Sequence, residues 1–173
     1  MPDAKNLQFS VLRAEDSKHI APYFYRRPNR TCDSCALDSY LWREYCDILI
    51  AEEEDKALFL LMDREGEKYT AMPYCDEKDL PIYFREIEEY FNEVLQQPLK
   101  IYLADEEAVK FLTLEENPRY LVEEEEDFKD YLYDAEELRT LPGKRFYKKK
   151  NRVNKFKSCL LYTSDAADDL LCV

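Results

Sequence analysis

The sequence predicts a mixed α+β fold: a mainly antiparallel sheet flanked by helices and followed by a long basic C-terminal helix. Three apolar segments, 47–51, 57–62 and 68–72, follow one another with short connections, as in an antiparallel meander. An amphipathic helical pattern fills 80–97, and a basic helical pattern begins at residue 144. Hydrophobic residues make up 46% of the 173 residues, which is enough to build one core.

The N-terminal part is predicted to form one strand and two helices. Apolar residues alternate over 8–12, which predicts a strand. A helix over 15–25 would carry its apolar residues on one side, and a second helix is expected over 34–45. The apolar side of the first helix contains Ile20, Tyr23 and Phe24; the second helix carries Leu37, Tyr40, Leu41 and Tyr45 at i, i+3, i+4 and i+8, together with Trp42. This spacing is typical of a helix face that packs on a core.

The three central strands differ in pattern. The segment 47–51 carries Ile48 and Ile50 in alternate positions, whereas 57–62 is continuously apolar, as in a central strand covered on both faces. Gly66 can supply the positive φ of the turn before 68–72, and Pro73 ends that strand.

The helix over 80–97 is the clearest element, with Asp79 predicted as its cap and Pro98 as its stop. Its apolar stripe contains Ile82, Phe84, Ile87, Phe91, Val94 and Leu95, and its expected solvent face contains Glu86, Glu88, Glu89 and Glu93.

The remaining elements alternate between strand and helix. Strands are expected over 99–103, 120–122 and 128–133, and helices over 106–113, 135–138 and from 144 onward. Asp105 and Asp134 are predicted caps of the first two helices. The last helix carries Phe146, Val153 and Phe156 on one face. A meander followed by helix, strand, helix and strand is the plan of an acyltransferase fold of the GNAT type.

Charge is distributed unevenly along the chain. The net charge is −13, but residues 1–138 carry 16 basic and 35 acidic side chains, whereas 138–157 carry nine basic and none acidic. The acidic part argues against general nucleic-acid binding, because polyphosphate would be repelled. The local basic segment could still meet a phosphate, a tRNA or an acidic surface.

The sequence also indicates a compartment. The N-terminus lacks the apolar segment of a secretory signal, and no apolar run approaches the ~20 residues that span a bilayer. We therefore expect no stable membrane insertion, a cytoplasmic protein, and six cysteines present as free thiols.

Two segments resemble a known family. Residues 33–43 read DSCALDSYLWR, and residues 141–156 read LPGKRFYKKKNRVNKF. Both resemble signatures of the DUF2156 family, which is related to the C-terminal domain of phosphatidylglycerol lysyltransferase. The resemblance covers about 8–157. It implies two tandem GNAT-like domains, with the second signature at their join, and a relationship to aminoacyl-tRNA-dependent transferases.

The resemblance suggests a domain plan. We expect a GNAT-like N-terminal domain over 1–140 and a basic connector helix over 141–157 that begins a missing C-terminal GNAT-like domain, which would be the main partner. Residues 158–173, SCLLYTSDAADDLLCV, resemble translated sequencing-adapter read-through, so we expect a non-native tail. The connector should project from the body, with low order after about residue 157.

The basic helix holds the candidate substrate-binding residues. Lysine and arginine bind phosphate through charge and donated hydrogen bonds, and the asparagines could add polar contacts. The candidates are Lys144, Lys148, Lys149, Lys150, Asn151, Arg152, Asn154 and Lys155. The alternative is an interdomain helix whose charges only neutralise the acidic body.

Other motifs favour structural roles. Cys32-x-x-Cys35 lacks the further ligands of a zinc site, and His19 has no nucleophile motif beside it. The acidic runs 52–55 and 123–126 lack calcium-loop spacing, so no metal is expected. With only Gly66 and Gly143, the glycine-rich turn that grips the pyrophosphate of CoA cannot be assembled, and no cofactor is predicted.

Three functions remain open. The first is the N-terminal half of a two-domain acyl- or aminoacyltransferase, inactive alone and with unidentified catalytic residues. The second is a non-catalytic scaffold whose acidic body and basic helix dock a partner. The third and weakest is a nucleic-acid-binding module acting through the basic helix.

Overall fold

The computed structural model describes residues 7–27, 31–53, 55–102 and 104–169, with side chains described up to residue 159. The chain divides into two compact units, Met1–Asp130 (unit 1) and Tyr131–Val173 (unit 2). The expected domain boundary at residue 140 and the expected non-native tail both stay predictions.

Unit 1 is built around one antiparallel sheet. The order is β1 (Ser10–Val11), β2 (Leu49–Glu53), β3 (Ala57–Arg64) and β4 (Glu67–Thr70), and β5 (Tyr74–Cys75) also pairs with β3. Leu49 faces Leu61 and Glu53 faces Ala57 in the β2–β3 ladder, and Arg64 faces Glu67 where β3 turns into β4. Gly66 has a φ of 86° in that turn, as predicted. The three central strands are therefore confirmed.

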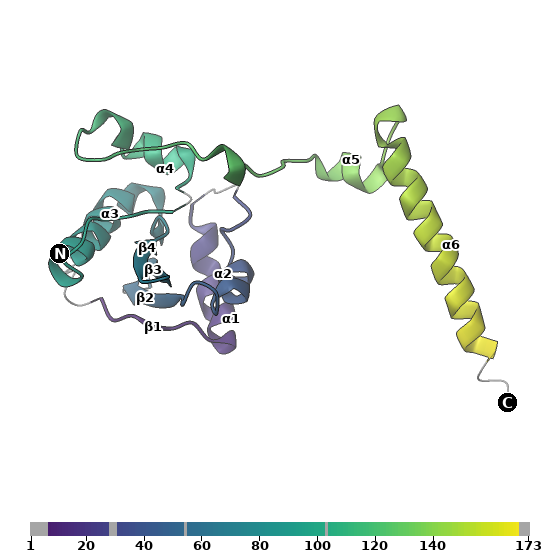
Figure 1. Ribbon diagram of the computed structural model, residues 1–173, viewed down its shortest axis with the longest axis horizontal. Helices are drawn as coiled ribbons and strands as arrows, with labels where there is room; N and C mark the ends of the chain where they lie inside the picture. Colours follow the sequence, from purple (N-terminus) through teal and green to yellow (C-terminus); the bar gives the residue numbers. More distant parts are fainter. Residues whose placement is uncertain (1–6, 28–30, 54, 103, 170–173) are drawn as a thin grey trace. The chain divides into compact units, whose positions relative to one another are not determined.

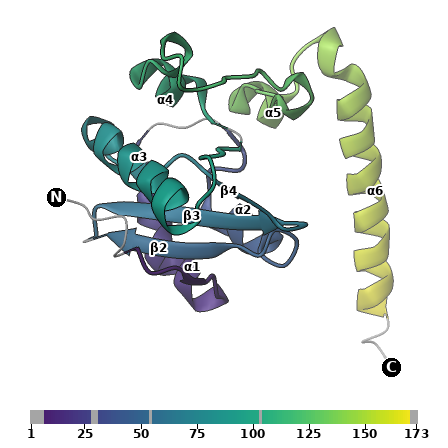
Figure 2. The same cartoon turned by 60° about the vertical axis from the view of Figure 1, so that its left-hand side comes forward.

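Helices cover both faces of this sheet (Figures 1 and 2). On one face lies α3 (Leu80–Glu89), extended by a π-helical turn (Tyr90–Val94), with α4 (Glu106–Phe111). On the other lie α1 (Ser17–Ile20), flanked by 3₁₀ turns (Ala14–Asp16 and Ala21–Tyr25), and α2 (Ala36–Trp42). The overall arrangement is the predicted mixed α+β fold with one antiparallel sheet between helices, and it is consistent with a GNAT-like fold.

Strand β3 separates two core clusters. Ala57, Phe59 and Leu61 belong to the cluster under α3, whereas Leu58 and Leu60 belong to the cluster under α1 and α2. Successive side chains of a strand point to opposite faces, so a strand that is covered twice has to be continuously apolar. This explains the unbroken apolar run in the sequence.

The apolar stripe expected on α2 is wrong as a core face. Leu37, Leu41 and Tyr45 are 63%, 66% and 57% exposed, and Trp42 is 51% exposed. The helix instead buries its small residues, Ala36 and Ser39. Ala36 belongs to the core cluster under α1 and α2, and Tyr40 of the predicted stripe packs against that cluster while it is partly exposed. The other large apolar residues of the stripe face outward.

The helix after β5 also differs in detail. Phe84, Ile87 and Phe91 are buried as predicted, but Ile82 and Val94 are exposed. Glu86, which was expected to face solvent, is 3% exposed and lies inside. The π turn at Tyr90–Val94 contributes to the exposure of Val94, because it changes the register at the end of the helix.

The predicted later strands are mostly absent. Within 99–102 there is only one parallel bridge, in which Thr70 N donates to Lys100 O at 2.9 Å and Tyr102 N donates to Thr70 O at 3.0 Å; residue 103 lies outside the described residues. The described residues 120–134 contain no strand, only a 3₁₀ turn at Glu126–Phe128. Five consecutive acidic residues, 123–127, repel one another and interrupt the apolar alternation that a strand needs.

Unit 2 contains α5 (Ala135–Thr140), a 3₁₀ turn (Lys144–Phe146) and α6 (Tyr147–Asp169). The backbone of α6 continues to Asp169. Residues 158–169 contain neither proline nor glycine, so nothing local stops the helix. The expected low order after about residue 157 stays a prediction, and the side chains after residue 159 lie outside the described residues. No helix within the described residues could cross a bilayer.

Candidate functional site

The basic surface of unit 2 is positioned by a turn between two helices. Asp134 caps α5 as predicted, accepting a hydrogen bond from Glu137 N at 2.8 Å. Leu141, with a φ of 48°, ends that helix, and Gly143, with a φ of 67°, redirects the chain into the 3₁₀ turn at Lys144. Glycine tolerates this conformation at no steric cost, so Gly143 fixes where the basic helix begins.

The sole described large side chain buried in unit 2 is Phe146, which is 3% exposed. Cations lie over aromatic rings here: the Arg145 guanidinium is 5.3 Å from the Phe146 ring centre, and Lys149 Nζ is 4.8 Å from that of Tyr133. Lys149 Nζ is also 5.8 Å from the Phe146 ring centre. Lys149 is therefore occupied by cation–π contacts, unlike the other candidates.

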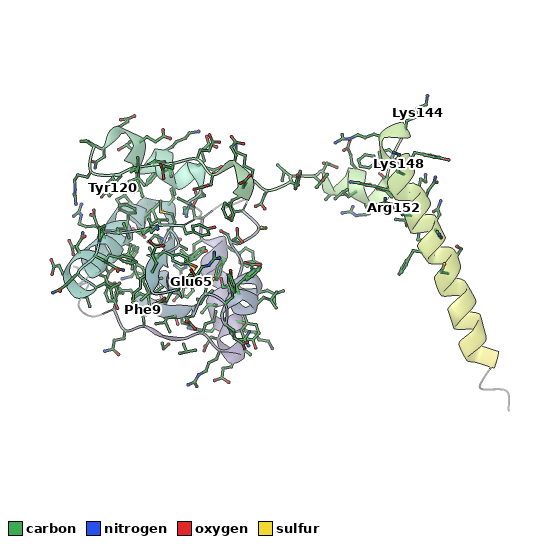
Figure 3. All side chains as sticks on the ribbon, viewed as in Figure 1. Phe9, Glu65, Tyr120, Lys144, Lys148 and Arg152 are labelled. Atoms are coloured by element: carbon green, nitrogen blue, oxygen red, sulfur yellow. The ribbon has the colours of Figure 1, made fainter. Side chains whose placement is uncertain are left out.

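Helical spacing divides the other candidates into two groups. Lys148, Arg152 and Lys155 stand at i, i+4 and i+7 of α6 and share one face, with Asn151 at its edge. Lys150 and Asn154 stand at i and i+4 on a different face. Lys144 precedes them on the 3₁₀ turn; Figure 3 labels it together with Lys148 and Arg152.

The first group is exposed and electrostatically uncompensated. Among the described residues, no carboxylate forms an ion pair with Lys144, Lys148, Arg152 or Lys155, although Arg145 lies 3.6 Å from Glu137 and Arg139 lies 2.5 Å from Glu136. Three like charges along one helix face repel one another at a free-energy cost of a few tenths of a kcal/mol per pair, ~0.2–0.5. A bound anion would remove that repulsion.

The three apolar residues that were predicted on one face of the last helix are not all buried. Phe146 is buried, but Val153 is 40% exposed and Phe156 is 64% exposed. Two of the three residues that were predicted on one apolar face are therefore not buried.

Cys32 and Cys35 act structurally. The Cys35 side chain caps α2, because its Sγ accepts a hydrogen bond from Asp38 N at 3.3 Å. Cys32 N donates to Asp130 Oδ2 at 2.7 Å, and the Cys32 thiol also bonds to Asp130, which raises the pKa of that thiol to about 12. A thiol with a raised pKa is a poor nucleophile. Within the described residues, no cluster of His, Cys, Asp and Glu could hold a metal ion.

His19 and the acidic runs are also bound into local contacts. His19 Nε2 lies 2.8 Å from Glu52 Oε2, which also accepts a hydrogen bond from Tyr23 OH at 2.8 Å. Burial, reinforced by Glu52, raises the pKa of the Tyr23 phenol. In the other run, Glu124 and Glu126 each lie 2.7 Å from Lys129 Nζ. The contacts of Glu52 connect β2 to the helical segment 14–25, and the Lys129 ion pairs stabilise the 3₁₀ turn at Glu126–Phe128.

The sequence did not indicate the buried ion pair between Arg27 and Asp105. Arg27 Nη1 donates to Asp105 Oδ1 at 2.6 Å, and the same oxygen caps α4 by accepting from Ala108 N at 2.9 Å. The two side chains are 5% and 3% exposed. The sequence predicted Asp105 as a cap but indicated no role for Arg27. The two residues are 78 positions apart, so no local signal indicates that they meet.

A family model described as "Phosphatidylglycerol lysyltransferase, C-terminal" matches residues 26–170. The chain belongs to this family. The matched range contains both segments that resembled the family in the sequence, 33–43 and 141–156. It thus covers α2 with its cysteine cap as well as the turn and basic helix of unit 2.

One solved structure shares the fold of this lysyltransferase-like chain. It is a conserved protein of unknown function from Bacteroides thetaiotaomicron VPI-5482, with 22% identity and a TM-score of 0.76. The alignment covers 88% of this chain and 51% of that one, so the chain spans about half the length of this relative. No curated protein matches the chain.

Proposed function

We propose that this chain supplies the N-terminal, GNAT-like half of an acyl- or aminoacyltransferase related to phosphatidylglycerol lysyltransferase, and that it is inactive without a second domain. The family match over 26–170 carries this proposal. The relative of about twice the length supports it, because that chain has room for a second domain of similar size. Its catalytic residues would lie outside the residues discussed above.

In this proposal, the basic face of α6 holds a phosphate of the substrate. Lys148, Arg152 and Lys155 offer three exposed positive charges on one helix face, and Lys144 lies just before them. Aminoacyl-tRNA, the donor that the family resemblance implies, is a polyanion of this kind, and another phosphate-bearing substrate would bind by the same chemistry. Binding of a polyphosphate releases counterions, so the affinity must fall as salt rises.

Binding of deacylated tRNA, measured by fluorescence anisotropy against salt, tests this role. We expect the Lys148→Glu/Arg152→Glu/Lys155→Glu variant to lose most of the affinity and to lower the log–log salt slope by about three, roughly one per lost phosphate contact. The matched control reverses two lysines and one arginine on unit 1: Lys18→Glu/Lys78→Glu/Arg85→Glu. Equal losses in both variants would show only a general charge effect and would contradict the proposal.

A non-catalytic scaffold remains the second candidate, because unit 1 is acidic and the 138–157 segment is basic. The gene beyond codon 157 separates the two candidates. A second α/β domain encoded there would support the transferase, whereas an early stop codon in an uninterrupted genomic reading frame would support the scaffold. The same genomic sequence tests the adapter origin of 158–173.

A further inference from the structure

We propose that the exposed apolar face of α2 pairs with the same face of a second copy of this chain, as a two-fold symmetric dimer. The face consists of Leu37, Leu41, Trp42 and Tyr45, each more than half exposed. Contiguous apolar patches of this kind are uncommon on monomers and mark interaction surfaces. The proposal is independent of the transferase function.

The face is held in a fixed shape. Trp42 and Tyr45 meet edge to face, with ring centres 5.6 Å apart. Trp42 also donates a hydrogen bond to Asp38, and Cys35 caps the helix beneath them. Leu37 and Leu41 lie about one helical turn apart on α2, and Tyr45 lies in the turn that follows the helix. A rigid face of this kind loses little conformational entropy when it is covered.

The charges at the two ends of this face are complementary to each other. Asp33 and Asp38 lie at its N-terminal end, where burial and the nearby Asp33 raise the pKa of Asp38. At the opposite end the Arg64 guanidinium lies 5.0 Å from the Tyr45 ring centre. No described carboxylate forms an ion pair with Arg64, and no described cation forms one with Asp38.

This polarity selects a second copy as the occupant. In a two-fold pair, residue i of one copy meets residue j of the other, and j meets i. Antiparallel packing of two α2 faces therefore places each Asp38 next to the Arg64 of the other copy, with the leucines between them. A parallel arrangement would place like charges together, at a cost in affinity. The face is small compared with the ~800 Å² per partner of a standard interface, so we expect a weak, concentration-dependent dimer.

Sedimentation velocity of the full chain from about 1 to about 100 µM tests the proposal. We expect reversible dimerisation, and we expect Leu41→Asp to raise the dissociation constant at least tenfold. Leu121→Asp is the matched control, because Leu121 is 84% exposed in the same unit and lies far from this helix in sequence. Circular dichroism verifies that each variant is folded. A chain that stays monomeric, or a dimer weakened equally by both substitutions, would overturn the proposal.

Charge exchange tests the antiparallel arrangement. Asp38→Arg and Arg64→Asp, made singly, should each weaken the dimer several-fold, because each places like charges across the interface. The double variant should restore the affinity, because it exchanges the signs at both ends. A double variant as weak as the single ones would contradict the arrangement, as would a dimer that is lost on Phe156→Asp but retained by Leu41→Asp.

Discussion

Arg27 and Asp105 place a guanidinium and a carboxylate in the interior of unit 1. Asp105 Oδ1 accepts a hydrogen bond from Arg27, but Asp105 Oδ2 is buried without a described hydrogen-bond partner. Arg27 Nε is also buried without a described hydrogen-bond partner. Arg27→Met would leave a buried carboxylate without its countercharge. We expect a loss of ~3–5 kcal/mol in the free energy of unfolding, measured by urea denaturation.

A second substitution tests the cause of that loss. Asp105→Asn removes the charge and keeps an oxygen that can cap α4. The double variant Arg27→Met/Asp105→Asn should therefore be more stable than Arg27→Met alone. If it is not, the uncompensated charge is not what destabilises the single variant.

The Asp63 carboxylate provides a pH-dependent contribution to stability. Lys68 Nζ donates to it at 2.8 Å and Gly66 N at 2.9 Å, and these bonds lower the pKa of Asp63, with Lys68 the larger cause. A group whose pKa is lower in the folded state stabilises the fold above its unfolded pKa, which is about 3.9 for aspartate. That contribution disappears as the pH falls through the folded pKa.

Asp63→Asn should therefore be less stable than the parent chain near neutral pH, and this difference should shrink steadily below about pH 4. Urea denaturation at a series of pH values measures it. Lys68→Met should remove most of the same pH dependence, because it removes the main cause of the shift. A difference that stays constant down to pH 2 would assign the effect to packing instead.

At the scale of single elements, the cap of α2 tests whether the CxxC pair has a chemical role. Cys35 acts through a weak sulfur acceptor. Cys35→Ala should lower the free energy of unfolding by ~1 kcal/mol, whereas Cys35→Ser should match or exceed the parent chain, because serine is a better cap. Thermal unfolding under reducing conditions measures both. Destabilisation of equal size in both variants would show that the thiol itself is needed.

Some elements of the fold could be predicted from sequence patterns alone, and others could not. The β2–β3–β4 meander was predictable, because strand periodicity and a turn glycine are both local signals, and so were the Asp105 and Asp134 caps. The exposed face of α2 was not, because the stripe of Leu37 and Leu41 is the same whether a helix packs inward or outward. Which side of the helix is buried depends on the residues that pack against it, and Ala36 meets core residues that come from other elements.

The candidate site, too, was predictable only where the signal in the sequence is local. Seven of the eight basic and polar residues could be assigned to one helix, since helical spacing is local, whereas Lys144 lies on the 3₁₀ turn before it. The separate role of Lys149 could not be predicted, because its cation–π contact with Tyr133 spans a turn whose path depends on the φ angles of Leu141 and Gly143. The prediction of strands over 120–122 and 128–133 was wrong for another reason. A strand needs a neighbouring strand to pair with, and the residues of a segment do not reveal whether it has one.

At the scale of the whole molecule, stability is concentrated in unit 1. Both core clusters draw all of their buried residues from 7–114, whereas unit 2 buries only Phe146 among its described large side chains. Charge follows the same division: residues 131–157 carry nine basic and three acidic side chains, and residues 1–130 carry 16 basic and 32 acidic. Hydrophobic burial is the main stabilising contribution, so unit 1 should fold without the residues that follow it.

A fragment of residues 1–130 should therefore unfold cooperatively, with a midpoint within about 2–4 °C of that of the full chain, which corresponds to less than ~1 kcal/mol. Fluorescence of Trp42, the sole tryptophan, and far-ultraviolet circular dichroism follow the transition. A shorter fragment, 1–125, is the sharper comparison, because it removes Asp130 and with it the contact to Cys32. It should unfold at a lower temperature than 1–130. If 1–130 is itself unfolded, or melts far below the full chain, then residues 131–173 contribute to the stability of unit 1 and the two units are not energetically independent.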